Sequence, residues 1–219
     1  MMNKATAFLL TLGLASTPAL ADPIVGLFNT GVNGAGATKA NNTPEIHYSL
    51  FSAPAGSSPS LRVATSANGF PLPPWIGDNL SSAWIGPDGN ADLSGPAGTY
   101  DYRISFALPA TANPATVLIT GQWATDNPGT DILINGGPSG SSSGSFTSFA
   151  PFVLNANFHA GVNTLDFLVN NTPIAGPNPT GLRVEFASAT VDVPEPSAIA
   201  LSGLALSVLG MVRRRRRRT

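Results

Sequence analysis

The sequence predicts an all-β protein, an antiparallel β-sandwich, on three observations. Apolar and polar residues alternate over several short segments, which is the pattern of strands with one buried face. Gly (23) and Pro (20) are abundant among the 219 residues and separate these segments as turns. No segment between Asp22 and Val193 has a sustained helical period. Because strands with one apolar face need a second sheet to bury it, two packed sheets follow.

The alternation places the strands in order along the chain. It is clearest at 100–108, and the same period occurs at 46–50, 61–65, 117–123, 165–169 and 182–186. We expect the sheets to cover about residues 24–191. The side chains that we expect in the core are those of Tyr102, Ile104, Phe106, Trp123, Phe167 and Val184.

The N-terminal segment has the three parts of a secretory signal peptide. Lys4 is basic, the run from Ala5 to Ala15 is apolar, and Ala19 and Ala21 form an Ala-x-Ala cleavage site. The apolar run is too short to span a bilayer, and the alternative is a buried first helix. We predict export through the Sec machinery and cleavage after Ala21.

The C-terminal segment also has three ordered parts. Val193, Pro194, Glu195 and Pro196 precede sixteen uncharged residues (197–212), and six arginines (213–218) follow. As a helix, the uncharged run is about 24 Å long, slightly less than the hydrocarbon core of a bilayer. The arginines would stay on the cytoplasmic side by the positive-inside rule. We therefore predict a transmembrane helix.

These C-terminal parts resemble the PEP-CTERM sorting signal of Gram-negative bacteria. The resemblance implies that an exosortase recognises the Pro-Glu-Pro motif and processes the tail during export. It also implies an inner-membrane precursor that reaches the cell surface or the extracellular matrix. The expected domains are a signal peptide at 1–21, a β-sandwich at 22–190 and a sorting segment at 191–219.

The middle of the chain resembles the galactose-binding-like jelly roll in three places. Residues 100–109 are similar to its aromatic-Arg-x-x-Phe-x-Leu-Pro strand, 123–136 to a strand pair ending in Asn-Gly, and 160–165 to its Gly-x-Asn-x-Leu turn. Domains of this kind bind sugars in glycosidases and occur in many exported bacterial proteins. The resemblance implies a fold and transfers no ligand residue.

Charge and cysteine content exclude several functions. Between Asp22 and Pro196, four basic and twelve acidic residues leave a net charge of −8. Such a body repels phosphate backbones, so we expect no nucleic-acid partner, although a nucleic-acid patch is the alternative interpretation of the arginine run. The absence of cysteine excludes disulfides, thiolate metal sites and a cysteine nucleophile.

No catalytic constellation is evident, so we predict that the protein is not an enzyme. Ser142 lies in a Gly-x-Ser-x-Gly match that no helical pattern follows, unlike a nucleophile elbow. His47 and His159 are expected to be structural or surface residues. Asp126 and Asp131 are candidates for the two carboxylates of a glycosidase, which lie about 5–10 Å apart. A secreted hydrolase of matrix polysaccharide is therefore the alternative.

One acidic turn has the oxygen spacing of a calcium loop. Asp88, Asn90 and Asp92 stand at positions i, i+2 and i+4, but Leu93 replaces the expected glycine and Thr99 the closing glutamate. We expect a solvated turn and no cofactor, with calcium as the alternative.

The tryptophans suggest where a sugar would bind, since aromatic faces stack on sugar rings. Trp84 and Trp123 belong to apolar strand patterns and are expected in the core. Trp75 follows Pro71, Pro73 and Pro74 in a loop, so it is the tryptophan that we take as the candidate for exposure and ligand contact, with packing over the end of the sandwich as the alternative. The sequence thus favours a non-enzymatic protein of the cell envelope or extracellular matrix, with extracellular polysaccharide as a candidate partner.

Overall fold

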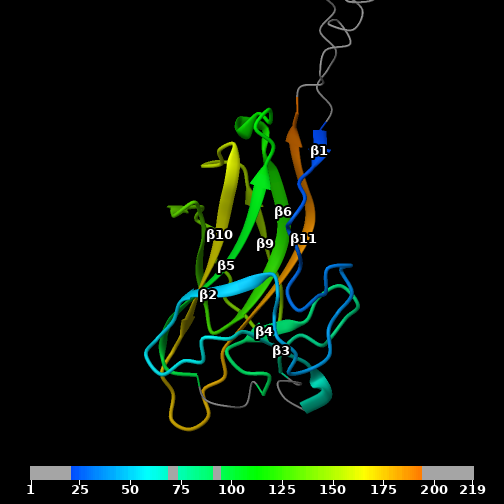
Figure 1. Cartoon of the computed structure of the whole chain (residues 1–219). Coiled ribbons are helices and arrows are strands. Elements are labelled where there is room, and N and C mark those ends of the chain that lie inside the picture. The colour runs from blue at the N-terminus through cyan, green and yellow to red at the C-terminus, as the bar shows by residue number, and fades with distance from the viewer. Residues whose placement is uncertain (1–20, 69–73, 91–94, 194–219) are drawn as a thin grey trace, which may run out of the picture. The chain divides into compact units, whose positions relative to one another are not determined.

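A computed structural model describes residues 21–68, 74–90 and 95–193, which Figure 1 draws in colour. The predicted apolar run at 197–212 and most of the predicted signal peptide lie outside the described residues. Within the described ranges, no helix is long and apolar enough to cross a membrane.

The first sheet has the strand order β3-β4-β11-β6-β9, and β1 pairs with β11. Its strands are β1 (Ala21–Pro23), β3 (Arg62–Ala64), β4 (Trp84–Gly86), β6 (Leu118–Asp126), β9 (Ala150–Leu154) and β11 (Gly181–Asp192). All its pairings are antiparallel.

The second sheet has the order β2-β5-β10-β7-β8 and is also antiparallel. Its strands are β2 (Tyr48–Ser52), β5 (Gly98–Leu108), β7 (Gly129–Ile134), β8 (Gly137–Pro138) and β10 (Gly161–Asn171). Two short 3₁₀ turns, η1 (Ser66–Asn68) and η2 (Pro114–Thr116), are the helical elements among the described residues.

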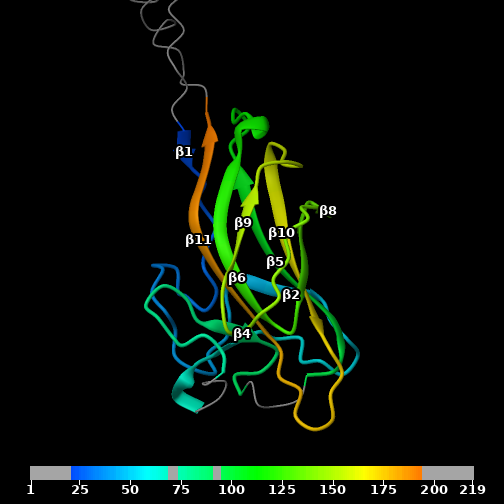
Figure 2. The same cartoon turned by 180° about the vertical axis from the view of Figure 1, so that it is seen from behind.

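Successive strands alternate between the sheets. Apart from the β7–β8 hairpin, each strand from β5 to β11 lies in the opposite sheet from its predecessor. Jelly rolls have this arrangement of two antiparallel layers, which the opposite views of Figures 1 and 2 display. The predicted all-β antiparallel sandwich is confirmed.

The core lies between the two sheets. All six side chains expected there are at most 4% exposed. The Trp123 and Phe167 rings, from opposite sheets, have centroids 5.7 Å apart. Gly121 interrupts the apolar alternation of β6 because a Cβ there would lie 2.4 Å from the Glu185 carbonyl oxygen.

Two element boundaries differ from the sequence prediction. Ile46 precedes β2 and is 57% exposed, because pairing with β5 begins only at Tyr48. At the other end, β11 runs two residues past the predicted domain boundary at 190. Pairing with β1 holds these last residues in the sheet.

Candidate functional site

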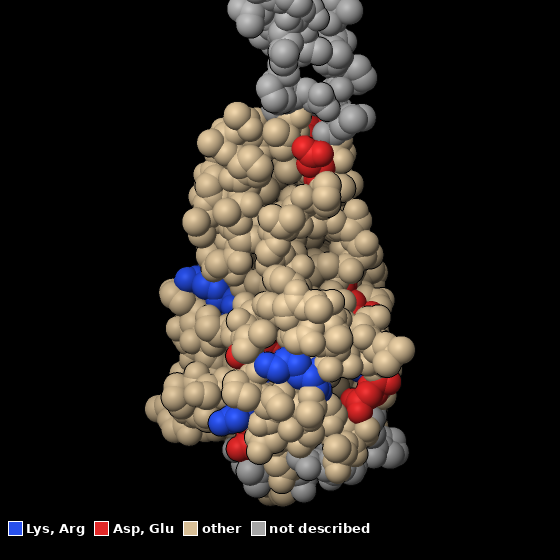
Figure 3. Space-filling model, turned by 45° about the vertical axis from the view of Figure 1, so that its right-hand side comes forward, with Lys and Arg blue, Asp and Glu red and all other residues tan. Residues whose placement is uncertain are grey.

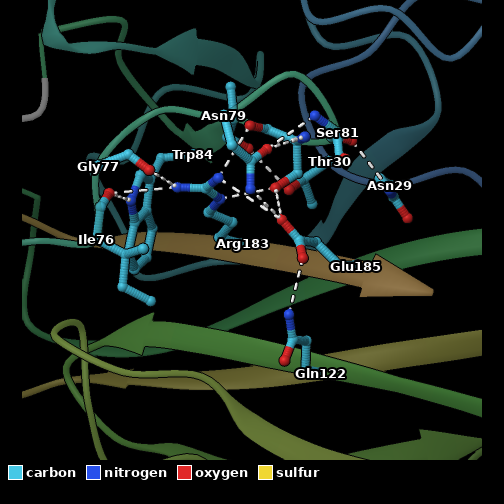
Figure 4. Close-up of polar contacts among 12 residues, drawn as sticks. Asn29, Thr30, Ile76, Gly77, Asn79, Ser81, Trp84, Gln122, Arg183 and Glu185 are labelled. Atoms are coloured by element: carbon cyan, nitrogen blue, oxygen red, sulfur yellow. Dashed lines mark hydrogen bonds and ion pairs between the residues drawn. The ribbon is translucent and has the colours of Figure 1, made fainter. Parts of the chain in front are cut away.

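A buried ion pair lies on the outer face of the first sheet. Leu182 and Val184 point into the core, so the strand period places Arg183 and Glu185 on the opposite face of β11. Arg183 is nevertheless 0% exposed, because the loop of residues 75–83 covers it. Figure 4 shows the loop residues gathered around these two side chains.

The Arg183 guanidinium connects the loop to the sheet. Nε donates to Ser82 Oγ at 2.7 Å, Nη1 donates to the Gly77 and Ile76 carbonyls at 2.7 and 3.2 Å, and Nη2 donates to the Ser82 carbonyl at 3.1 Å. Burial lowers the pKa of Arg183, whereas the charges of Glu185 and Asp78 act in the opposite direction. Its planar fork of donors suits this task better than a lysine ammonium would.

The Glu185 carboxylate accepts three side-chain hydrogen bonds. Asn79 Nδ2, Ser82 Oγ and Gln122 Nε2 donate to it at 2.8, 2.6 and 2.8 Å, and Arg183 Nη2 lies 3.6 Å away. Burial alone would raise the pKa of Glu185, but these hydrogen bonds and the Arg183 charge lower it overall. The carboxylate is therefore a fixed, ionised support for Asn79 and Ser82.

The supported loop forms one wall of a polar hollow of about 380 Å³. Its polar lining includes Lys39, Asn41, Thr65, Ser66, Asp78 and Asn79, which come from three separate segments of the chain. Asp78 Oδ2 accepts from the Ser66 backbone N–H and hydroxyl, and Asn41 Oδ1 accepts from the Thr65 N–H. These bonds join the segments, so the hollow is pre-formed.

Three polar groups of the hollow keep hydrogen-bonding capacity. Among the described residues, Asp78 Oδ1 and Asn41 Nδ2 have no protein partner, and Lys39 Nζ donates to the Pro44 carbonyl without a carboxylate partner. A carboxylate acceptor, an amide donor and an ammonium together match the hydroxyl groups of a sugar, which both donate and accept.

Trp75 is buried, so the packing alternative describes its position and exposure does not. Its side chain is 4% exposed, its ring lies 4.3 Å from that of Trp84, and its Nε1 donates to Asp126 Oδ2 at 2.9 Å. Both rings belong to a small apolar cluster with Ala64 and Ala124. A ring packed in this way offers no open face for a sugar.

The acidic turn is only partly described. Asp88 Oδ1 accepts from the Asn90 N–H at 2.8 Å, as in an Asx turn, and Asp92 lies outside the described residues. Over the described ranges, no group of three or more His, Asp or Glu side chains could hold a metal ion.

The two candidate carboxylates, Asp126 and Asp131, accept hydrogen bonds from separate sets of protein donors. Asp126 ends β6 in the first sheet, whereas Asp131 lies on β7 in the second. Asp126 accepts from Trp75 and Asn127, and burial raises its pKa to about 6, with the Trp75 hydrogen bond acting in the opposite direction. Asp131 Oδ1 accepts from Ile132, Ser139 and Gly140.

The remaining candidates have contacts of their own. Ser142 is exposed in the loop between β8 and β9. The His47 ring stacks on Phe28 at 3.7 Å, and His159 Nδ1 lies 3.0 Å from the Ala160 carbonyl oxygen. Each histidine thus has a local structural contact.

The surface drawn in Figure 3 is largely neutral, with basic and acidic side chains as separate spots. This sparse charge follows from the composition, since charged residues make up 11% of the chain.

The predicted sorting residues begin where β11 ends. Val193 is half-buried against the core, Pro194, Glu195 and Pro196 lie outside the described residues, and Ala21 of the predicted cleavage site opens β1. Residues 192–217 match the family described as the PEP-CTERM protein-sorting motif. The chain carries a PEP-CTERM motif. This motif indicates an exported protein with a membrane-anchored precursor. The resemblance to the PEP-CTERM sorting signal that the sequence predicted is confirmed.

The folded part is similar to several solved carbohydrate-binding modules. "Structure of CBM35 from Paenibacillus barcinonensis" is 18% identical, with a TM-score of 0.33, and covers 67% of this chain and 98% of its own. A family 35 carbohydrate binding module from Clostridium thermocellum is 14% identical, with a TM-score of 0.29, and covers 67% and 88%. The Podospora anserina GH26-CBM35 β-(1,4)-mannanase is 13% identical, with a TM-score of 0.34, and covers 73% and 29%. No curated protein matches the chain.

Sequence reasoning missed the residues around the polar hollow. Lys39, Asn41 and Asp78 lie in three segments without a common motif, so their proximity has no local signal. Arg183 did have a local signal in the sequence. It is among only four basic residues between Asp22 and Pro196, and it lies two positions from Glu185 on a strand.

Proposed function

We propose that this chain is a non-enzymatic protein of the cell surface or extracellular matrix of a Gram-negative bacterium, sorted by an exosortase. The PEP-CTERM motif at 192–217 is the observation that carries the proposal. The acidic sandwich between the two terminal segments is the part that would be displayed, anchored in the inner membrane before processing and then exposed or released.

The arrangement of the catalytic candidates supports a non-enzymatic role. A glycosidase needs two carboxylates that face one substrate, about 5–10 Å apart. Asp126 and Asp131 belong to different sheets, and each carboxylate is held by protein donors. Nothing in this arrangement favours the hydrolase alternative.

We further propose that the polar hollow binds extracellular polysaccharide. The proposal is supported by Asp78, Asn41 and Lys39, which line a pre-formed cavity and keep hydrogen-bonding capacity there. The described lining has no aromatic side chain, so binding would rest on hydrogen bonds and would be weak for a single sugar unit. Repeated units of a polymer would compensate through multivalency.

The sorting proposal is tested by mass spectrometry of the mature protein from a host that contains an exosortase. We expect the tail to be removed from the wild type. Replacing Pro194, Glu195 and Pro196 by alanine should block this removal without blocking membrane insertion. An intact C-terminus at Thr219 on most of the surface-located wild type would refute the processing step.

The ligand proposal is tested on a glycan array with the purified exported protein. We expect polysaccharide signals that Asp78→Asn reduces, because the amide removes the carboxylate's charge while it can still accept from Ser66. Asp88→Asn is the matched control outside the hollow. Equal signals for both variants, or no signal for the wild type, would argue against this site.

A further inference from the structure

The two ends of the described chain leave the sandwich side by side. Asp22 pairs with Val191 and Pro23 with Thr190, and Ile24 N–H donates to the Ala189 carbonyl at 2.9 Å. Both views show β1 along the end of β11 (Figures 1 and 2). Pro23 lacks an N–H, which is tolerated because β1 is an edge strand.

The stem of the sorting motif is also held from the other side. Asp192 N–H donates to Thr116 Oγ1 at 2.9 Å, and Asn113 N–H donates to the Asp192 carbonyl at 2.9 Å. Both backbone polar groups of Asp192 therefore have partners in the segment around η2. The chain is fixed up to the residue before Val193.

A mostly apolar groove of about 560 Å³ opens beside this stem. Ile24, Val25, Leu108, Pro109, Val191 and Val193 contribute its apolar walls. The Val25 side chain is 75% exposed, so an apolar side chain of the groove has no cover. Asp22 also lines the groove and gives its rim a carboxylate.

We propose that this groove is a docking surface for the exosortase that processes the PEP-CTERM tail. This inference rests on the proposed sorting function. No linker separates the groove from the motif, since Val193 lines the groove and Pro194 follows it. Three extended residues span only about 10 Å. A protein that encloses Pro194–Pro196 must therefore meet this end of the sandwich.

The chemistry of the groove defines the matching surface on the enzyme. Apolar side chains would fill the groove, and basic groups would lie near Asp22 and Asp192. The sandwich thus contributes to recognition beyond the tail itself.

The test compares two valine-to-aspartate variants of the full chain in an exosortase-containing host. Val25→Asp places a charge in the groove, and Val153→Asp, on β9, is a control at a 58% exposed valine outside it. The rate of tail removal is followed by pulse labelling and mass spectrometry. We expect Val25→Asp to slow removal by roughly tenfold, as for loss of one anchor contact. Val153→Asp should match the wild type.

A spacer distinguishes docking from an effect on folding. Six Gly/Ser residues inserted between Val193 and Pro194 can span about 20 Å and release the motif from the groove. In this spaced chain, Val25→Asp should no longer change the rate. Equal rates for the two valine variants without the spacer, or equal slowing with and without it, would overturn the proposal. A wild type that keeps its tail would instead refute the sorting function.

Discussion

Arg183 organises a loop that has no regular secondary structure. Its donors reach carbonyls of Ile76, Gly77 and Ser82, which would otherwise have to find water or each other. Because buried polar groups are costly when unpaired, one arginine fixes the position of the whole segment. Arg183 therefore supports the wall of the polar hollow, together with Glu185, which holds Asn79 and Ser82.

Arg183→Met should destabilise the fold by about 3–5 kcal/mol, because it leaves several loop carbonyls without their buried donor and removes the cation beside Glu185. Urea denaturation measures the change in the free energy of unfolding. Arg62→Met is the control, since Arg62 makes a hydrogen bond to the Asn42 carbonyl at the surface. Its cost should stay within about 0.5 kcal/mol. If Arg183→Met and the wild type unfold at the same urea concentration, the loop is held by other contacts.

Asp101 should make stability depend on pH. Burial and then the Asp166 charge raise its pKa, the Arg103 charge lowers it, and the net result is a pKa of about 6. The unfolded value is about 3.9, so the folded state binds the proton more tightly. The associated stability is present below pH 4 and is lost as pH rises to about 6.

Asp101→Asn should therefore flatten the fall in melting temperature between pH 4 and pH 6. Asp126 has a pKa raised in the same direction, so some of the fall should remain. Thermal unfolding at half-unit pH intervals measures how the melting temperature of the wild type and of the variant changes with pH. A steeper slope in the variant would contradict the assignment to Asp101.

At the scale of elements, β11 is the strand on which the molecule depends most. It pairs with β1, β4 and β6, carries core residues on one face and the Arg183–Glu185 pair on the other, and leads into the sorting motif. Its last residues lie beyond the pairing with β6, which ends at Thr190. Contacts from β1 and η2 replace that support.

Thr116→Val should loosen the end of β11 locally. The change removes the acceptor of the Asp192 N–H, and a hydrogen bond contributes about 1 kcal/mol. Amide hydrogen exchange at Asp192 should become roughly fivefold faster, while exchange in the core strands stays unchanged. Thr120→Val on β6 is the control, because its hydroxyl has no protein hydrogen bond in the described structure. Equal exchange at Asp192 in both variants would contradict the role of Thr116.

At the scale of the whole molecule, charge is divided between the chain's parts. The region from Asp22 to Pro196 carries a net charge of −8, whereas the C-terminal tail carries six arginines at 213–218. This division suits an exported body and a tail whose cations remain on the cytoplasmic side.

Replacing Arg213–Arg218 by glutamine should weaken membrane retention and orientation of the precursor. Protease accessibility of the two chain ends in spheroplasts measures this. The alanine variant of Pro194, Glu195 and Pro196 is the counterpart, because it should insert normally and fail only in processing. If the precursor inserts in the same way with and without the arginines, the arginines do not set its retention or orientation.

The sequence by itself determined the fold class, the strands and the C-terminal sorting motif, because these are local properties. A period of two follows from the covalent geometry of an extended chain, and it assigned Tyr102, Trp123 and Val184 to the core. Only the tertiary structure decided which outward-facing residues are covered. Trp75 and Arg183 are buried because the 75–83 loop folds back on the first sheet. Likewise, β1 joins β11 across most of the chain's length. Such contacts form between segments that are far apart in the sequence, according to which of them can bury and hydrogen-bond one another. The alternation within one strand does not predict these partners.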